Sequence, residues 1–290
     1  MTALDHPFDW HLHLGWLLGL LAVAAAYGWA TRRAGWEATR RQRTLFSLAL
    51  ILVLAAVTWP LGDLAAHWSL LALVLQRLVL MLAVPPLLVV GTPRPIIMWL
   101  TRPPAVDALL RVVVKPAPAI VIVTVVSVGT LTTGAVNLAS RSEVARMLVQ
   151  LIVLLTGFVL WAPVLSELPG ATRLSALGRG GYLIVQSIVP SFLSVVWIFA
   201  RRSLYPPYSH PETVAGMSPV LDQQLAGFLA KLSTIAVLWT VAFVIMRRAQ
   251  VMTGTDEDPE PLLWSDVERE IERADRRERR DGWPGPPGLQ

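Results

Sequence analysis

The sequence contains no cysteine and is poor in charge. The cysteine count is 0, which excludes disulfides, thiolate metal sites and thiol catalysis. Charged residues make up 16% of the 290 residues, whereas soluble proteins average about 25%. Hydrophobic residues make up 54%, and the mean hydropathy is +0.55. This balance predicts a membrane protein, in which the net charge of +5 matters through its placement in loops and not as a nucleic-acid signal.

Catalytic motifs are absent as well. The chain has no Walker loop, no G-x-S-x-G and no H-E-x-x-H motif. No carboxylate lies deep inside an apolar run, so a proton relay would be hard to build. We therefore predict that the protein is not an enzyme, has no catalytic residue and binds no nucleic acid.

Long apolar runs are what the sequence does have. A membrane-spanning helix needs about 20 mostly apolar residues, which predicts an all-α integral membrane protein with a bundle of about seven transmembrane helices. Residues 1–250 would form this domain, and 251–290 a charged cytoplasmic tail. The predicted spans are Leu14–Ala30, Thr44–Leu61, Leu70–Val90, Ala117–Leu138, Val144–Leu165, Tyr182–Ala200 and Leu225–Met246.

The tail differs sharply in composition from the rest of the chain. Ser265 and Glu268 form a capping-box pattern, which predicts a short charged helix, and the last residues, "GWPGPPGLQ", resemble disordered segments. The tail is either a solvated end without a role or a docking helix for a partner.

The basic residues predict the orientation of the bundle, because cytoplasmic loops carry an excess of Lys and Arg. The segment before the first run and the loop Gly62–Ser69 carry none, and the other two loops on that side carry only Arg141, Arg146, Arg201 and Arg202. We expect the N-terminus outside and the C-terminus in the cytoplasm of a bacterial plasma membrane. The basic residues assigned to the inner side in the first two such loops are Arg32, Arg33, Arg40, Arg41, Arg43, Arg94, Arg102, Arg111 and Lys115.

Several polar side chains interrupt the apolar runs. A charge in mid-membrane costs about 2.5–3.5 kcal/mol on insertion scales, and Arg77 lies roughly 10 Å below the outer start of its run. The group could be structural, with Arg77 and Lys231 reaching the interface or pairing. Alternatively, it lines a cavity that opens outward and accepts an anionic guest. This predicted intramembrane polar layer comprises Gln76, Arg77, Gln150, Asp222, Gln223, Gln224 and Lys231.

The five histidines all fall on the predicted outer side. Because imidazole binds copper and zinc, a shared face would allow a surface metal site. The alternative is that these side chains are ordinary interfacial residues that never meet. The candidates are His11, His13, His67 and His210.

Four segments carry a resemblance to a known family. In chain order they are "AVPPLLVVGTP" (Ala83–Pro93), "LTGFVLWAPVL" (Leu155–Leu165), "ARRSLYPPY" (Ala200–Tyr208) and "SPVLDQQLAGFLAKL" (Ser218–Leu232). Together they resemble the CtaG family of bacterial assembly factors for the caa-type cytochrome c oxidase. The resemblance implies seven spans and a role in oxidase maturation, at the copper centre of the oxidase.

The chain departs from this family's pattern at the expected metal ligands. The resemblance implies a His-x-x-Gln-His segment in the third span, where this chain has "LVLQR" with Gln76 retained. It also implies His-x-x-x-His at the start of the fifth span, where the chain has "RMLVQ". A tyrosine–aspartate pair of the family is replaced by Val136 and Asn137. Guanidinium has no lone pair to offer, so we expect no metal at Leu73, Arg77, Arg146 and Gln150.

Three functions follow from these observations. The first is a membrane assembly factor for a cytochrome c oxidase without an intramembrane copper site, whose partners are oxidase subunits or other assembly factors. The second is a copper-delivery protein that uses the outer histidines. The third is a transporter or lipid-handling protein that uses the polar layer. The first predicts no cofactor, and the second predicts copper.

Overall fold

The computed structural model describes residues 13–33, 35–165, 174–188, 192–209 and 216–256, together with Arg273 and Arg276. The secondary structure of these residues is helical. The chain divides into two compact units, Met1–Met246 and Arg247–Gln290, and the description below concerns the first. The predicted helix around Ser265 and Glu268 lies outside the described residues.

The first helices follow the apolar runs closely. Helix α1 (Leu14–Ala30) coincides with its predicted span. Helix α2 (Arg40–Val57) starts earlier than predicted because Thr39 and Gln42 form a capping box that satisfies its first N–H groups. A short helix, α3 (Leu61–His67), occupies the segment predicted as a loop.

The third run forms one rod of three helical segments, α4 (Leu70–Leu78), the π-helical turn η1 (Val79–Ala83) and α5 (Val84–Gly91). Proline has no N–H to donate and crowds the preceding turn. The rod widens to π geometry just before Pro85 and Pro86, as helices do where the regular ladder is interrupted. The two prolines therefore distort the rod without ending it.

The next segment lies partly across the bundle end. Helices α6 (Arg94–Leu100) and α7 (Pro104–Val113) follow the rod, and α7 meets α8 (Pro116–Thr130) at a bend of 95°. The predicted single span Ala117–Leu138 is wrong at its end. Helix α8 stops at Thr130, and Thr132 caps a new helix, α9 (Thr133–Arg141).

The remaining helices complete the bundle. They are α10 (Glu143–Trp161), α11 (Ala176–Ile188), α12 (Phe192–Phe199), the 3-10 turn η2 (Pro206–Tyr208) and α13 (Pro219–Asp256). Helix α13 continues beyond residue 250, where the predicted membrane domain ends.

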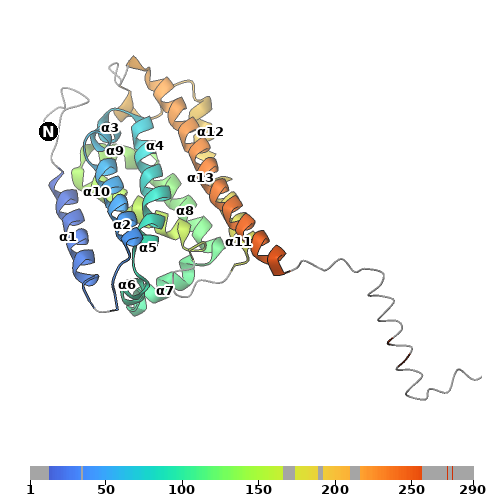
Figure 1. Ribbon diagram of the computed structural model, residues 1–290. Helices are drawn as coiled ribbons and strands as arrows, with labels where there is room; N and C mark the ends of the chain where they lie inside the picture. Colours follow the sequence, from blue (N-terminus) through green and yellow to red (C-terminus); the bar gives the residue numbers. More distant parts are fainter. Residues whose placement is uncertain are drawn as a thin grey trace, which may run out of the picture. The chain divides into compact units, whose positions relative to one another are not determined.

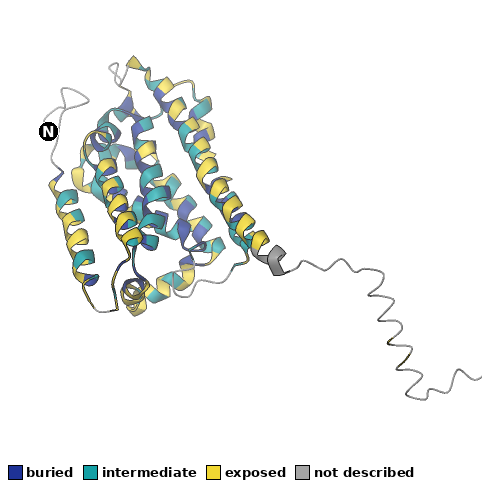
Figure 2. Cartoon of the chain, in the orientation of Figure 1, coloured by how far each residue is buried: buried dark blue, intermediate teal, exposed yellow. Residues whose placement is uncertain are grey.

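Among the described residues, five helical stretches are long and apolar enough to cross a membrane, and a sixth arises if the bent α7–α8 pair is one span. The 17-residue α1 is apolar but shorter than these. Figure 2 shows exposed residues along the outward faces of α1 and α13. Leu18 of α1 and Phe243 of α13 are large apolar side chains that are exposed there, as lipid-facing residues are in membrane helices.

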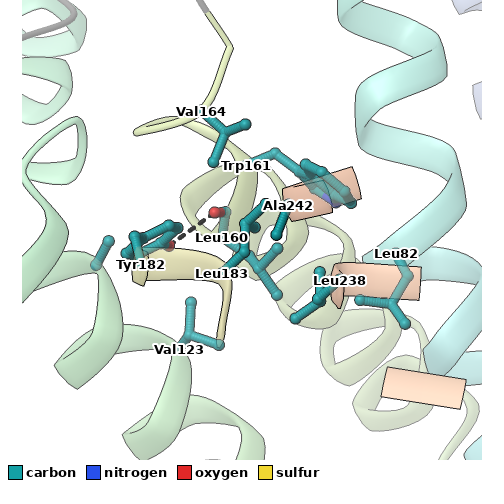
Figure 3. Close-up of a cluster of buried hydrophobic side chains, with 10 residues drawn as sticks. Leu82, Val123, Leu160, Trp161, Val164, Tyr182, Leu183, Leu238 and Ala242 are labelled. Carbon is teal, nitrogen blue, oxygen red and sulfur yellow. Dashed lines mark hydrogen bonds between the residues drawn. The ribbon is translucent and has the colours of Figure 1, made fainter. Parts of the chain in front are cut away.

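One apolar cluster of the core lies between η1, α8, α10, α11 and α13. Figure 3 shows part of it, with Leu183, Leu238 and Ala242 packed against Trp161. The Tyr182 hydroxyl donates to the Leu160 carbonyl at 2.7 Å, so its polar end is satisfied inside the apolar cluster.

The two ends of the bundle differ. Helices α3 and α9 lie at one end, which we call the α3 end, and α6 and α7 lie at the other, the α6 end (Figure 1). The turn η2 packs against α9 at the α3 end. At the α6 end the Trp36 ring lies 6.1 Å from that of Trp99, which ties the α1–α2 connection to α6.

Candidate functional site

The four positions at which this chain lacks the histidines of the family pattern surround one cavity. Leu73 and Arg77 reach it from α4, and Arg146 and Gln150 reach it from α10. Its volume is about 20 Å³, room for about one water-sized particle. Val136 of α9 also lines it. We call this space, near the α3 end, the arginine cavity.

Arg77 is held by the end of a neighbouring helix. Its Nη1 donates to the Thr130 hydroxyl at 2.6 Å, and its Nη2 donates to the Thr130 carbonyl at 2.9 Å. Thr130 is the last residue of α8, where carbonyl groups lack helical partners and the helix dipole is negative. The helix end thus compensates part of a charge that is only 9% exposed.

The other polar groups of the arginine cavity connect it to the surrounding helices. The Gln76 amide donates to the Ala56 carbonyl of α2 at 2.7 Å. The Gln150 carboxamide oxygen accepts from the Trp16 indole of α1 at 2.8 Å. Arg146 lies beside His67, with 3.4 Å between Nη1 and Nε2. The cavity therefore joins α1, α2, α3, α4 and α10.

The residues around this cavity do not fit a copper ion. Leucine carries no ligand atom, and guanidinium carries no lone pair and stays charged. The carboxamide oxygen of Gln150 is already used by Trp16. Two guanidinium groups would also repel an incoming cation. The chemistry of this set suits an anion or water.

Asp222, Gln223 and Gln224 of the predicted polar layer lie at the start of α13, where they hold backbone groups. Asp222 accepts from the Ser69 hydroxyl at 2.6 Å and from the Leu70 N–H at 2.7 Å. Gln223 accepts from the Leu204 N–H at 2.8 Å, and Gln224 donates to the Ala200 carbonyl at 3.3 Å. Lys231 is half-buried and lines neither the arginine cavity nor the larger one described below.

Two tyrosines contribute to the site beyond the predicted set. The Tyr208 hydroxyl donates to the Ala65 carbonyl at 2.6 Å, and Tyr208 lines the arginine cavity. The Tyr205 hydroxyl donates to the Leu131 carbonyl at 2.7 Å. Burial raises the pKa of the Tyr208 phenol, so it stays protonated and remains a donor. The sequence signal was the Tyr-Pro-Pro-Tyr motif, whose prolines fix the turn between the two rings.

The outer histidines are placed in part. The Nε2 of His13 lies 2.9 Å from Asp63 Oδ1, a buried contact between α3 and the residue before α1, and His67 lies beside Arg146. His11 and His210 lie outside the described residues. Within the described part of the chain, no three His, Asp or Glu side chains gather as a metal site would require.

The long apolar helices, whose backbone groups are paired within each helix, define a multi-pass α-helical membrane protein. A family model described as cytochrome c oxidase caa3 assembly factor (Caa3_CtaG) matches residues 7–250. The chain therefore belongs to this family of membrane assembly factors, as its sequence motifs predicted. Comparison with curated proteins found no match, and neither did comparison with solved structures.

Proposed function

We propose that this chain assists maturation of a cytochrome c oxidase as a non-catalytic scaffold that holds no copper in the arginine cavity. Its partners would be oxidase subunits or another assembly factor. The observation that supports this proposal is the pair of guanidinium groups, Arg77 and Arg146, on one small cavity. Cations in the place of ligands disfavour a bound metal cation, while the bundle around them remains able to bind a partner.

The proposal includes the arrangement in the membrane. Five or six spans meet the length and hydropathy criteria, and α1, at 17 residues, falls at the lower end of the roughly 17–25 residues that can cross. Counting α1 and the bent pair gives seven spans. An odd number places the termini on opposite sides of a bacterial plasma membrane, with the N-terminus outside and the tail after residue 250 in the cytoplasm.

Copper retention tests the absence of a metal site. The full chain, purified in detergent and exposed to Cu(I), should retain no more copper after desalting than a blank without protein. A matched variant carries Leu73→His, Arg77→His, Arg146→His and Gln150→His, which supplies imidazole ligands at all four positions, and it should retain copper. Stoichiometric copper on the unmodified chain would refute the metal-free cavity.

A deletion strain tests the role in maturation. Membranes from a strain that lacks this chain should lose the haem spectrum of the mature oxidase, and added copper should not restore it. The unmodified chain expressed from a plasmid should restore the spectrum. Unchanged oxidase levels in the deletion strain would refute an assembly role. Rescue by copper alone would instead favour copper delivery through the histidines.

A further inference from the structure

A second and larger cavity lies deeper in the bundle. Its volume is about 100 Å³, and it is bounded by α4, η1, α8, α10, α11, α12 and α13. Most of its lining is apolar, and Leu82, Val123 and Leu160, three of the side chains drawn in Figure 3, form part of its wall. We call it the inner cavity. Arg77 lines both this space and the arginine cavity.

Arg77 brings positive charge that is only partly compensated to the inner cavity. Thr130 accepts from two of its nitrogens, and a guanidinium has five N–H donors, so donors remain for a further acceptor. Among the described residues, no carboxylate forms an ion pair with Arg77. A helix end supplies only partial negative charge. The site therefore favours an anion.

Gln186 of α11 is a second polar group without a partner. It is 1% exposed and lines the inner cavity. Within the described part of the chain, neither its Oε1 nor its Nε2 has a hydrogen-bond partner. Buried carboxamides in native proteins are nearly always hydrogen-bonded, so an unpaired one on a cavity wall points to a missing partner. An acceptor on a ligand would satisfy Nε2, and a water molecule could donate to Oε1.

We propose that the inner cavity binds a small monocarboxylate with a short apolar body. The carboxylate would accept hydrogen bonds from Arg77, since guanidinium and carboxylate make charge-assisted contacts, and from the Gln186 amide. The apolar body would lie against the leucine and valine wall. A cavity of about 150 Å³ can hold benzene, and butyrate has as many non-hydrogen atoms as benzene, so a four-carbon acid is the upper size limit for the smaller inner cavity.

Water is the alternative occupant of the inner cavity. A cavity this large could hold several water molecules, and water could satisfy Gln186 without any ligand. Water alone predicts no preference for negative charge and no effect of a monocarboxylate on the protein. Butyrate and butyramide separate the two possibilities, because they have nearly the same shape and differ in charge.

The experiment uses the full chain in detergent micelles and measures butyrate binding by saturation-transfer NMR titration. Butyrate should bind saturably, and butyramide should bind at least about tenfold more weakly. Arg77→Gln should weaken butyrate binding by about tenfold or more, because it removes the cation. Arg146→Gln is the matched control, since Arg146 lines only the arginine cavity of the two, and it should leave binding unchanged.

A cavity-filling variant keeps the test informative if Arg77→Gln does not fold. Ala230 lines the inner cavity from α13, and Ala230→Leu adds apolar volume there without removing a polar group, so it should abolish butyrate binding. Absence of saturable binding by the unmodified chain would overturn the proposal, and so would equal binding of butyramide. Binding that survives Ala230→Leu would also overturn it, because the acid would then lie elsewhere.

Discussion

Asp222 is a single carboxylate that joins two segments distant in the chain. It lies in the first turn of α13, is 3% exposed, and accepts hydrogen bonds from Ser69 and from the Leu70 N–H. Ser69 is the N-cap of α4 and Leu70 its first residue. The carboxylate therefore satisfies an orphan N–H at the positive end of a second helix. This contact fixes the start of the α4 rod, which carries Arg77, against α13.

We expect Asp222→Ala to destabilise the chain by about 2–5 kcal/mol, because two buried donors would lose a charged acceptor. Asp222→Asn should be milder, since it keeps one acceptor oxygen. The measurement is thermal unfolding of the purified chain in detergent.

Asp107→Ala is the control for this prediction. Asp107 forms an exposed pair with Arg111 one turn along α7, and such pairs contribute about 0.2–0.5 kcal/mol. Equal shifts of Tm for Asp222→Ala and Asp107→Ala would contradict the structural role of Asp222.

At the scale of elements, one close contact locks α10 against the π-helical turn. A methyl group on Gly157 would lie 2.8 Å from the Met81 carbonyl oxygen and 2.9 Å from the Met81 Cα. Both are backbone atoms of η1, so they cannot move aside as the end of a side chain can. Small residues at helix interfaces allow such close approach in membrane proteins. The widened turn and the glycine therefore fit each other.

We expect Gly157→Ala to destabilise the chain by about 1–3 kcal/mol through overpacking. Gly19→Ala on α1 is the matched control, because a methyl group there meets nothing within 4 Å, and it should cause no loss. Thermal unfolding in detergent compares the two. If the Gly157→Ala chain were as stable as the Gly19→Ala chain, the close contact between α10 and η1 would not contribute to stability.

The apolar runs predicted the helices better than their breaks. Hydropathy alone placed α1 at its observed ends and the α4–α5 rod within one residue, because length and composition decide both. The break after Thr130 depends on Arg77 taking the carbonyl of Thr130 and on the Thr132 cap. The first of these contacts is distant in sequence. Hydropathy alone predicts that the span continues from Thr130 to Leu138.

The site was predictable as a set of residues but not as an arrangement. The motif comparison identified the positions that meet at the arginine cavity. The sequence did not indicate that Asp222 accepts a hydrogen bond from α4, or that Gln150 accepts one from α1. Gln186 gave no signal either. A single glutamine in an apolar run becomes informative only when its missing partners are known from the packing.

For the whole molecule, charge is distributed unequally between the two ends. The α6 end carries an aromatic and basic cluster in which the Arg33 guanidinium lies 3.8 Å from the centre of the Trp29 ring and 5.2 Å from that of Trp36. Trp is enriched at both membrane interfaces, and Arg is enriched in cytoplasmic loops. The same end carries Arg94, Arg102, Arg111 and Lys115. The α3 end carries fewer basic residues, namely Arg141, Arg146, Arg201 and Arg202, beside His13, Asp63 and the tyrosine turn.

This asymmetry predicts that the α3 end lies outside, and the absence of native cysteine permits a direct test with single introduced cysteines. Thr133→Cys places a thiol at the exposed start of α9, and Glu37→Cys places one in the exposed α1–α2 connection. In intact cells a membrane-impermeant maleimide should label the first and not the second, whereas both should react after permeabilisation. The expected pattern follows because basic loops remain on the cytoplasmic side. The reverse pattern would place the arginine cavity near the cytoplasmic face and would require the proposed orientation to be inverted.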